Sequence, residues 1–187
     1  MIDSKPMNES YWVEPGRLLA GEHPGHWEER VARRRICGLL DAGVRVFVDL
    51  SERADAVTPY RDILARICRE RGLHAEYCWE PLASDTLPEH ADVVVHALRR
   101  VREGLESGTR VYVHCSDGID RTGMLMGCWL IERGYDPEAA LVELERRFAA
   151  MAKAKIYRST PSNALFAEWV ENWVPQLELR TPQCQAC

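Results

Sequence analysis

The residues best suited to chemistry are Cys115 and Arg121, six positions apart between a strand-like and a helix-like run. Residues 109–114 alternate β-branched and aromatic types, and residues 121–133 carry apolar side chains at helical spacing. A loop placed there offers free backbone N–H groups and the positive end of a helix dipole, which attract phosphate and stabilise a thiolate. Cys115 is therefore predicted to be a nucleophile of low pKa, and Arg121 to grip two phosphate oxygens with its planar guanidinium.

The other residues of this loop fit the same role. Gly118 permits a turn with positive φ, and Gly123 lets the helix pack closely. The Thr122 hydroxyl can donate to the cysteine sulfur and make it a better leaving group, while His114 is predicted to orient the loop. The alternative, a structural thiol beside a surface arginine, leaves this combination unexplained. Six residues are predicted to bind phosphate: Ser116, Asp117, Gly118, Ile119, Asp120 and Arg121.

Cleavage of a phosphomonoester also benefits from an acid that protonates the leaving oxygen. Asp85 is the first candidate, because it lies in a proline-bounded loop, residues 79–89, that follows a predicted strand. Asp117 and Asp120, in the cysteine loop itself, are the second candidates. Their alternatives are to pair with arginines, to bond substrate hydroxyls or to point outward. No metal or cofactor is predicted, because the loop dipoles and Arg121 supply the positive potential.

Strand and helix patterns alternate along the chain. They predict one α/β domain with a mainly parallel central sheet flanked by helices, and with its ligand site beyond the carboxyl ends of the strands, where Cys115 falls. A hairpin is predicted at about 12–21, further strands at 44–50, 74–79 and 109–114, and helices at about 27–40, 60–71, 94–105, 121–133, 137–150 and from Thr160-Pro161 onward.

Length and composition indicate a single globular unit of 187 residues. We predict a flexible N-terminus over residues 1–10, a domain over 11–175 and a tail over 176–187. A net charge of −5 gives no general reason to expect a nucleic-acid partner. The sequence shows no apolar run long enough to span a membrane and no signal peptide, so a cytoplasmic location is expected, with a monomer favoured.

The seven cysteines are an odd number without framework spacing, which predicts reduced thiols. Cys184 and Cys187 form a Cys-x2-Cys pair that we assign to the tail rather than to a zinc site. Cys78 is interpreted as a structural thiol, with a disulfide to an oxidised Cys115 as the alternative.

The pattern His-Cys-x5-Arg-Thr-Gly over residues 114–123 resembles the signature of cysteine-dependent protein tyrosine and dual-specificity phosphatases. Residues 11–21 and 47–52 resemble the opening hairpin and first core strand of small bacterial members, so the likeness covers about residues 11–173. It implies a dual-specificity-phosphatase-like fold and hydrolysis of phosphorylated proteins through a phosphocysteine intermediate. In related small phosphatases the acid stands where this sequence has Ser84, so Asp85 is displaced by one position.

Residues 115–122, Cys-Ser-Asp-Gly-Ile-Asp-Arg-Thr, are also similar to the Cys-Ser-Asp-Gly-Trp-Asp-Arg-Thr signature of myotubularins, which act on 3-phosphoinositides. Ile119 departs from that pattern, and the chain has no room for that family's accessory domains. This likeness makes a phosphoinositide or inositol-phosphate phosphatase the alternative, with a phosphorylated lipid or small molecule as substrate. A catalytically silent phosphate-binding module is the third reading.

Overall fold

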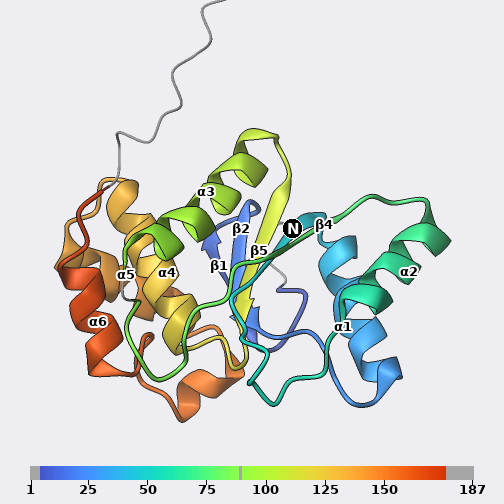
Figure 1. Ribbon diagram of the computed structural model, residues 1–187, viewed down its shortest axis with the longest axis horizontal. Helices are drawn as coiled ribbons and strands as arrows, with labels where there is room; N and C mark the ends of the chain where they lie inside the picture. Colours follow the sequence, from blue (N-terminus) through green and yellow to red (C-terminus); the bar gives the residue numbers. More distant parts are fainter. Residues whose placement is uncertain (1–4, 89, 176–187) are drawn as a thin grey trace, which may run out of the picture.

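The computed structural model describes residues 5–88 and 90–175. Its centre is a five-stranded sheet in the order β1-β2-β5-β3-β4 (Figure 1). Only the β1–β2 pair is antiparallel, and the other neighbours are parallel, which confirms the predicted α/β architecture. The strands are β1 (Ser10–Glu14), β2 (Leu18–Glu22), β3 (Val44–Asp49), β4 (Glu76–Trp79) and β5 (Arg110–Cys115).

Helices cover both faces of the sheet. α1 and α2 pack on one face, α3 and α4 pack on the other, and α5 and α6 rest against α4 (Figure 1). They are α1 (Glu29–Asp41), α2 (Arg61–Arg71), α3 (Asp92–Glu106), α4 (Asp120–Glu132), α5 (Pro137–Phe148), the 3₁₀ turn η1 (Ala152–Lys155) and α6 (Ala164–Glu171).

Two hydrophobic cores explain why the central strands are apolar throughout. Alternate side chains of a strand point to opposite faces of the sheet. Phe47 and Tyr112 are buried in the core beneath α1 and α2, whereas Val48 and Val113 are buried in the larger core beneath α3 to α6. The continuous apolar runs predicted for β3 and β5 therefore supply buried side chains to both cores.

The last helix begins later than the sequence pattern predicts. It starts at Ala164 rather than at Thr160-Pro161, and the Asn163 side chain caps it by accepting the Leu165 N–H at 3.0 Å. The preceding turn is held by α4, because the Asp120 carboxylate accepts the backbone N–H groups of residues 162 and 163. Asp120 thus holds residues 162 and 163 as the turn that precedes α6.

The ends of the chain only partly follow the predicted boundaries. Met7 is buried and β1 begins at Ser10, so part of the segment predicted to be flexible packs on the domain. Residues 1–4 and 176–187, including Cys184 and Cys187, lie outside the described residues. Within the described part of the chain, the helices are too short or too polar to cross a lipid bilayer.

Candidate active site

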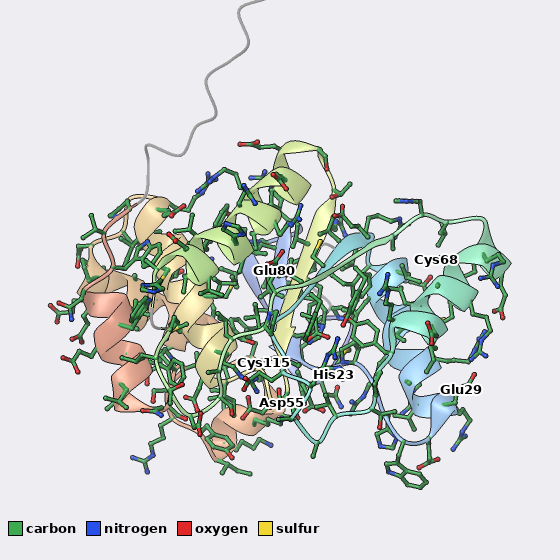
Figure 2. All side chains as sticks on the ribbon, viewed as in Figure 1. His23, Glu29, Asp55, Cys68, Glu80 and Cys115 are labelled. Carbon is green, nitrogen blue, oxygen red and sulfur yellow. The ribbon has the colours of Figure 1, made fainter. Side chains whose placement is uncertain are left out.

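The loop between β5 and α4 lies at the carboxyl edge of the sheet, as predicted. Figure 2 shows Cys115 there, with Asp55 and His23 nearby. Gly118 adopts a φ of +76°, the left-handed conformation that glycine tolerates best. A Cβ at this position would lie 2.3 Å from the carbonyl carbon of Gly21 in β2, so space and backbone conformation both require glycine. The loop is thereby seated on the N-terminal hairpin.

The Cys115 sulfur is fully buried and lies at the centre of the loop. It accepts the Gly118 N–H at 3.3 Å, and its thiol donates to Asp117 Oδ1 at 3.3 Å. Asp117 Oδ1 also accepts the Ile119 N–H at 3.1 Å, which fixes the carboxylate beside the sulfur. The predicted nucleophile therefore faces both a hydrogen-bond donor and a carboxylate.

The pKa of the Cys115 thiol corrects the expectation from sequence. Burial raises this pKa above its ordinary value and the Asp117 carboxylate raises it further, whereas Arg121 and Thr122 lower it. The net direction is upward, so the low pKa predicted from the loop dipole is wrong for this structure. That prediction weighed the helix terminus but not full burial beside a carboxylate.

Replacing Asp117 with asparagine is expected to lower the pKa of Cys115, because it removes a neighbouring negative charge and keeps the side-chain volume. The midpoint of the pH profile for iodoacetamide labelling should move to lower pH, with labelling at neutral pH severalfold faster. Mass spectrometry of the Cys115 peptide provides the measurement, and Asp85→Asn, which removes an exposed acid elsewhere, is the control. An unchanged or higher midpoint would show that Asp117 does not act on the sulfur.

Arg121 is buried and already engaged on one side. Its Nη1 donates to Asp55 Oδ2 at 2.7 Å and its Nη2 to Ser116 Oγ at 2.8 Å. The carbonyl oxygens of Leu50 and Leu82 accept further bonds from Nη1 at 3.4 and 3.3 Å. These contacts fix the plane of the guanidinium and leave Nε and one Nη2 hydrogen for an anion.

The two other acid candidates lie in different settings. Asp120 Oδ1 accepts the Ser162 and Asn163 backbone N–H groups at 2.7 and 2.8 Å and the Ser162 hydroxyl at 2.9 Å, so the carboxylate holds the segment before α6. Asp85 is exposed and makes no hydrogen bond or ion pair within the described residues. The structure therefore brings Asp117, and neither of these, into contact with the sulfur.

His114 belongs to a buried polar cluster behind the loop. Its Nε2 lies 2.7 Å from the Tyr60 hydroxyl and its Nδ1 lies 3.3 Å from the Cys115 carbonyl oxygen. Burial lowers the pKa of His114, which favours the neutral ring, although the Asp49 carboxylate acts in the opposite direction. The predicted orienting role thus has a contact at each ring nitrogen.

This cluster also contains the described residues best able to hold a metal ion. Ligand atoms of His23, Asp49 and His114 lie within 4.8 Å of one another. These side chains already have partners, however: Gly25 donates to His23 Nδ1, and Tyr77 donates to Asp49 Oδ2 at 2.7 Å. We therefore interpret the cluster as a hydrogen-bonded support for the loop.

Thr122 and Gly123 take the positions expected for the start of α4. Thr122 is buried, and its hydroxyl and backbone N–H lower the pKa of the Cys115 thiol. The hydroxyl has no hydrogen-bond partner among the described residues. A Cβ on Gly123 would lie 2.3 Å from Thr160 Oγ1, so the close packing predicted here is against the segment before α6.

Cys78 lies on the same sheet but not within disulfide reach of Cys115. Val48 of β3 is in register with Cys78 on one side and with Val113 on the other. Two strand spacings and two residues along β5 separate the cysteine Cα atoms by about 11–12 Å. A disulfide requires less than about 7 Å, which favours the structural reading of Cys78.

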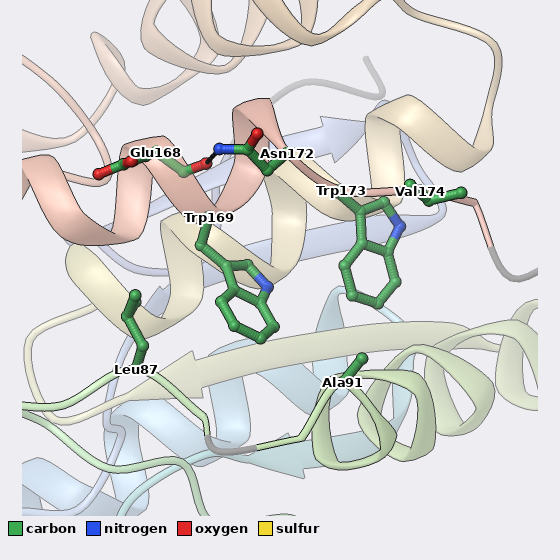
Figure 3. A pocket seen from close by; sticks show the side chains of 7 residues that line it. All are labelled: Leu87, Ala91, Glu168, Trp169, Asn172, Trp173 and Val174. Carbon is green, nitrogen blue, oxygen red and sulfur yellow. Dashed lines mark hydrogen bonds between the residues drawn. The ribbon is translucent and has the colours of Figure 1, made fainter.

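A separate apolar pocket of about 390 Å³ lies between α6 and the chain before α3 (Figure 3). Trp169 and Trp173 form one wall, and Leu87 and Ala91 form the other. None of the predicted site residues lines it. Leu87, two residues after Asp85, lines this cavity, and both Leu87 and Ala91 also pack against the larger core.

Three residues of the site were missed at the sequence level, namely Asp55, Tyr60 and Lys153. Asp55 and Tyr60 come from the segment between β3 and α2, and Lys153 comes from η1. Lys153 Nζ donates to the Asp117 carbonyl oxygen at 3.1 Å and pairs with Glu22 at 2.6 Å. For Asp55 and Tyr60 the sequence offered one signal, their place in the segment after β3. That segment starts at the same edge of the sheet as the cysteine loop.

This chain is similar to known phosphatases in sequence and in fold. "Putative tyrosine phosphatase 067L" of Invertebrate iridescent virus 3 is 23% identical over 172 residues, which is 89% of this chain and 60% of the viral protein. The chain thus spans about three fifths of that relative. The crystal structure of Pseudomonas aeruginosa TpbA with phosphotyrosine matches with a TM-score of 0.59 and 19% identity, covering 91% of this chain and 95% of TpbA.

A second structural neighbour is the catalytic core of the PP-IP phosphatase SIW14 from Saccharomyces cerevisiae. It matches with a TM-score of 0.62 and 18% identity, covering 91% of this chain and 88% of the SIW14 core. At these identities the likeness establishes the fold. A family model, the DSP-PTPase phosphatase domain of Swiss Army Knife proteins, matches residues 7–174. With almost its whole length matched, this chain belongs to that family of cysteine-dependent, protein-tyrosine-phosphatase-like phosphatases.

Proposed function

We propose that this chain hydrolyses phosphorylated proteins through a phosphocysteine intermediate on Cys115. The observation that carries the proposal is the seating of the buried Cys115 sulfur between the Gly118 N–H and Asp117 Oδ1, with the oriented Arg121 guanidinium in the same loop. A nucleophile, a fixed cation and a ring of backbone donors are the parts that phosphoryl transfer requires.

The first step begins with the Cys115 thiol, whose raised pKa calls for a base. Asp117 Oδ1 accepts the thiol proton as the sulfur attacks phosphorus, so an S–P bond forms and the P–O bond to the leaving group breaks. Arg121 and the amides of residues 116–121 stabilise charge on the non-bridging oxygens. Asp117 then passes the proton to the leaving oxygen, so the leaving group departs with a neutral hydroxyl.

In the second step, water attacks phosphorus and the S–P bond breaks. Asp117, ionised again, accepts a proton from the water, and the sulfur departs as a thiolate that Thr122 and the Gly118 N–H stabilise. Asp117 then returns this proton to the thiolate, which leaves inorganic phosphate and the resting Cys115 thiol. His114 acts as a positioning residue, because its contacts are to Tyr60 and to the Cys115 carbonyl oxygen rather than to the sulfur.

Asp117→Asn is expected to slow turnover about 100-fold or more, because asparagine cannot donate the proton to the leaving oxygen. The loss should be larger for phenyl phosphate, whose leaving oxygen is strongly basic, than for para-nitrophenyl phosphate. Asp85→Asn and Asp120→Asn are the matched variants. The same pattern in Asp85→Asn would assign the acid to the 79–89 loop and overturn the Asp117 relay.

The comparison that tests the function uses the parent protein in EDTA with four substrates. These are a phosphotyrosine peptide, a phosphoserine peptide, a soluble phosphoinositide and an inositol pyrophosphate. Phosphotyrosine is expected to be hydrolysed, in keeping with the viral relative's name and the TpbA complex. Tight phosphopeptide binding with no turnover of any substrate would support the silent binding module and contradict the proposal.

An inositol-phosphate or phosphoinositide phosphatase is the second candidate function. Two observations favour it: the similarity of the fold to a PP-IP phosphatase core, and the Asp117 carboxylate beside the nucleophile in a loop similar to that of myotubularins. Hydrolysis of the inositol substrates with phosphopeptides left intact would establish this candidate. The proposed chemistry at Cys115 would be unchanged.

A further inference from the structure

An exposed turn of unusual composition stands beside the phosphate loop. It begins at the last residue of η1 and consists of residues 155–158, Lys-Ile-Tyr-Arg, which we call the basic–apolar lip. The Ile156 side chain is 79% exposed and that of Tyr157 is 40% exposed. Their backbone N–H groups donate to the Lys153 carbonyl at 2.8 and 2.9 Å, so the turn has a defined backbone. Large apolar side chains are thus presented to solvent by an ordered element.

The lip is tied to the phosphate loop on both sides. Before it, Lys153 Nζ donates to the Asp117 carbonyl oxygen at 3.1 Å, and after it the Thr160 hydroxyl donates to the Ile119 carbonyl oxygen at 2.7 Å. In Figure 1, η1 is the orange turn at the lower edge of the molecule, near the carboxyl end of β5. A surface that binds the lip therefore lies close to Cys115.

The charged side chains of the lip differ in their pairing from most basic side chains of α1 to α3. Lys153 forms an ion pair with Glu22, and most arginines of α1 to α3 face a glutamate or aspartate. Lys155 and Arg158 make no ion pair within the described part of the chain. Because the whole protein carries a net charge of −5, any attraction of this edge for an anionic surface must be local.

We propose that the basic–apolar lip docks the protein on the surface of an anionic lipid bilayer. Lys155 and Arg158 would contact lipid phosphates, Tyr157 would lie at the headgroup level and Ile156 would enter the acyl boundary. Four exposed side chains are few for a specific protein interface, which buries about 800 Å² on each partner, whereas basic side chains are attracted one by one to an anionic bilayer. Docking here would place the phosphate loop beside the bilayer.

Vesicle co-sedimentation in EDTA tests this inference without depending on turnover. The full chain is expected to bind vesicles of 70% phosphatidylcholine and 30% phosphatidylserine, to bind pure phosphatidylcholine poorly and to be released by high salt. Ile156→Ser/Tyr157→Ser should weaken binding about fivefold or more. Lys155→Glu/Arg158→Glu should weaken it more than about tenfold. Hydrolysis of para-nitrophenyl phosphate by Ile156→Ser/Tyr157→Ser should match that of the parent.

Two matched double variants are the controls. Tyr135→Ser/Val142→Ser removes one exposed tyrosine and one exposed aliphatic side chain outside the lip, and Arg34→Glu/Arg69→Glu reverses two exposed charges on α1 and α2. Both should bind vesicles as the parent does. Absence of parent binding, or an equal loss in the controls, would overturn the inference. The inference would also be overturned if the lip variants bound vesicles as the parent does but had a raised KM for phosphopeptides. That result would assign the lip to the binding of protein substrates. None of these results would bear on Cys115.

Discussion

Cys115→Ser is expected to lose turnover by about 10⁴-fold or more while still binding phosphate or a phosphotyrosine peptide. The serine hydroxyl is a much weaker nucleophile than the thiol at neutral pH, and a phosphoserine intermediate would not be released readily. The binding partners, Arg121 and the loop amides, are untouched by this substitution. Steady-state hydrolysis and calorimetric titration with a phosphopeptide give the two readouts.

The control for this variant is Cys37→Ser, which alters a partly buried free cysteine outside the loop. It should retain parent activity, because neither its sulfur nor its surroundings belong to the phosphate loop. Substantial hydrolysis by Cys115→Ser would show that another group attacks phosphorus. Loss of phosphate binding together with activity would indicate that the substitution collapses the loop, which thermal unfolding of the variant would reveal.

Arg121→Lys is expected to lower kcat/KM by about 10²- to 10³-fold, the loss typical for a donor directed at developing charge. Lysine keeps the positive charge, and therefore the pairing with Asp55, but it lacks the planar fork that offers Nε and Nη2 together. Affinity for inorganic phosphate should fall as well. Para-nitrophenyl phosphate kinetics and phosphate inhibition constants measure both effects.

The matched control is Arg133→Lys, at the other end of α4, where the guanidinium pairs with Glu14 at 3.2 Å on the surface. Surface ion pairs contribute little to stability, so this variant should behave as the parent does. If Arg121→Lys retained nearly full activity, a point charge would suffice. The fork and its alignment by Asp55 would then have no role in the reaction.

Local patterns explain why the loop was predictable from sequence. A strand, a turn with glycine and a helix occur within the 14 residues from Arg110 to Gly123, so the positions of Cys115 and Arg121 follow from periodicity and loop chemistry alone. The alternation of elements in the same way predicted the parallel sheet and its two helical layers. In both cases the signal is a local periodic pattern, although the strand pairs themselves, such as Leu18 and Val111, are far apart in sequence.

The parts of the site that could not be predicted depend on contacts between distant segments. Asp55 reaches Arg121 across 66 residues, and its place in a polar turn gives no hint of a partner. Asp120 lies in the cysteine loop, where a catalytic acid could reach the substrate. Its carboxylate instead accepts the backbone N–H groups of Ser162 and Asn163, more than 40 residues later in the chain. Residue type and spacing indicate that an acid is present, whereas the direction of its side chain is decided by what packs beside it.

The anchoring of Asp120 by the segment before α6 also has a consequence for biosynthesis. The segment that fixes the first turn of α4 is translated about 40 residues after it, and the N-terminal hairpin that seats Gly118 is translated about 100 residues before it. The phosphate loop is therefore completed only after residues 162 and 163 have left the ribosome. Nascent chains that end before this segment should be inactive.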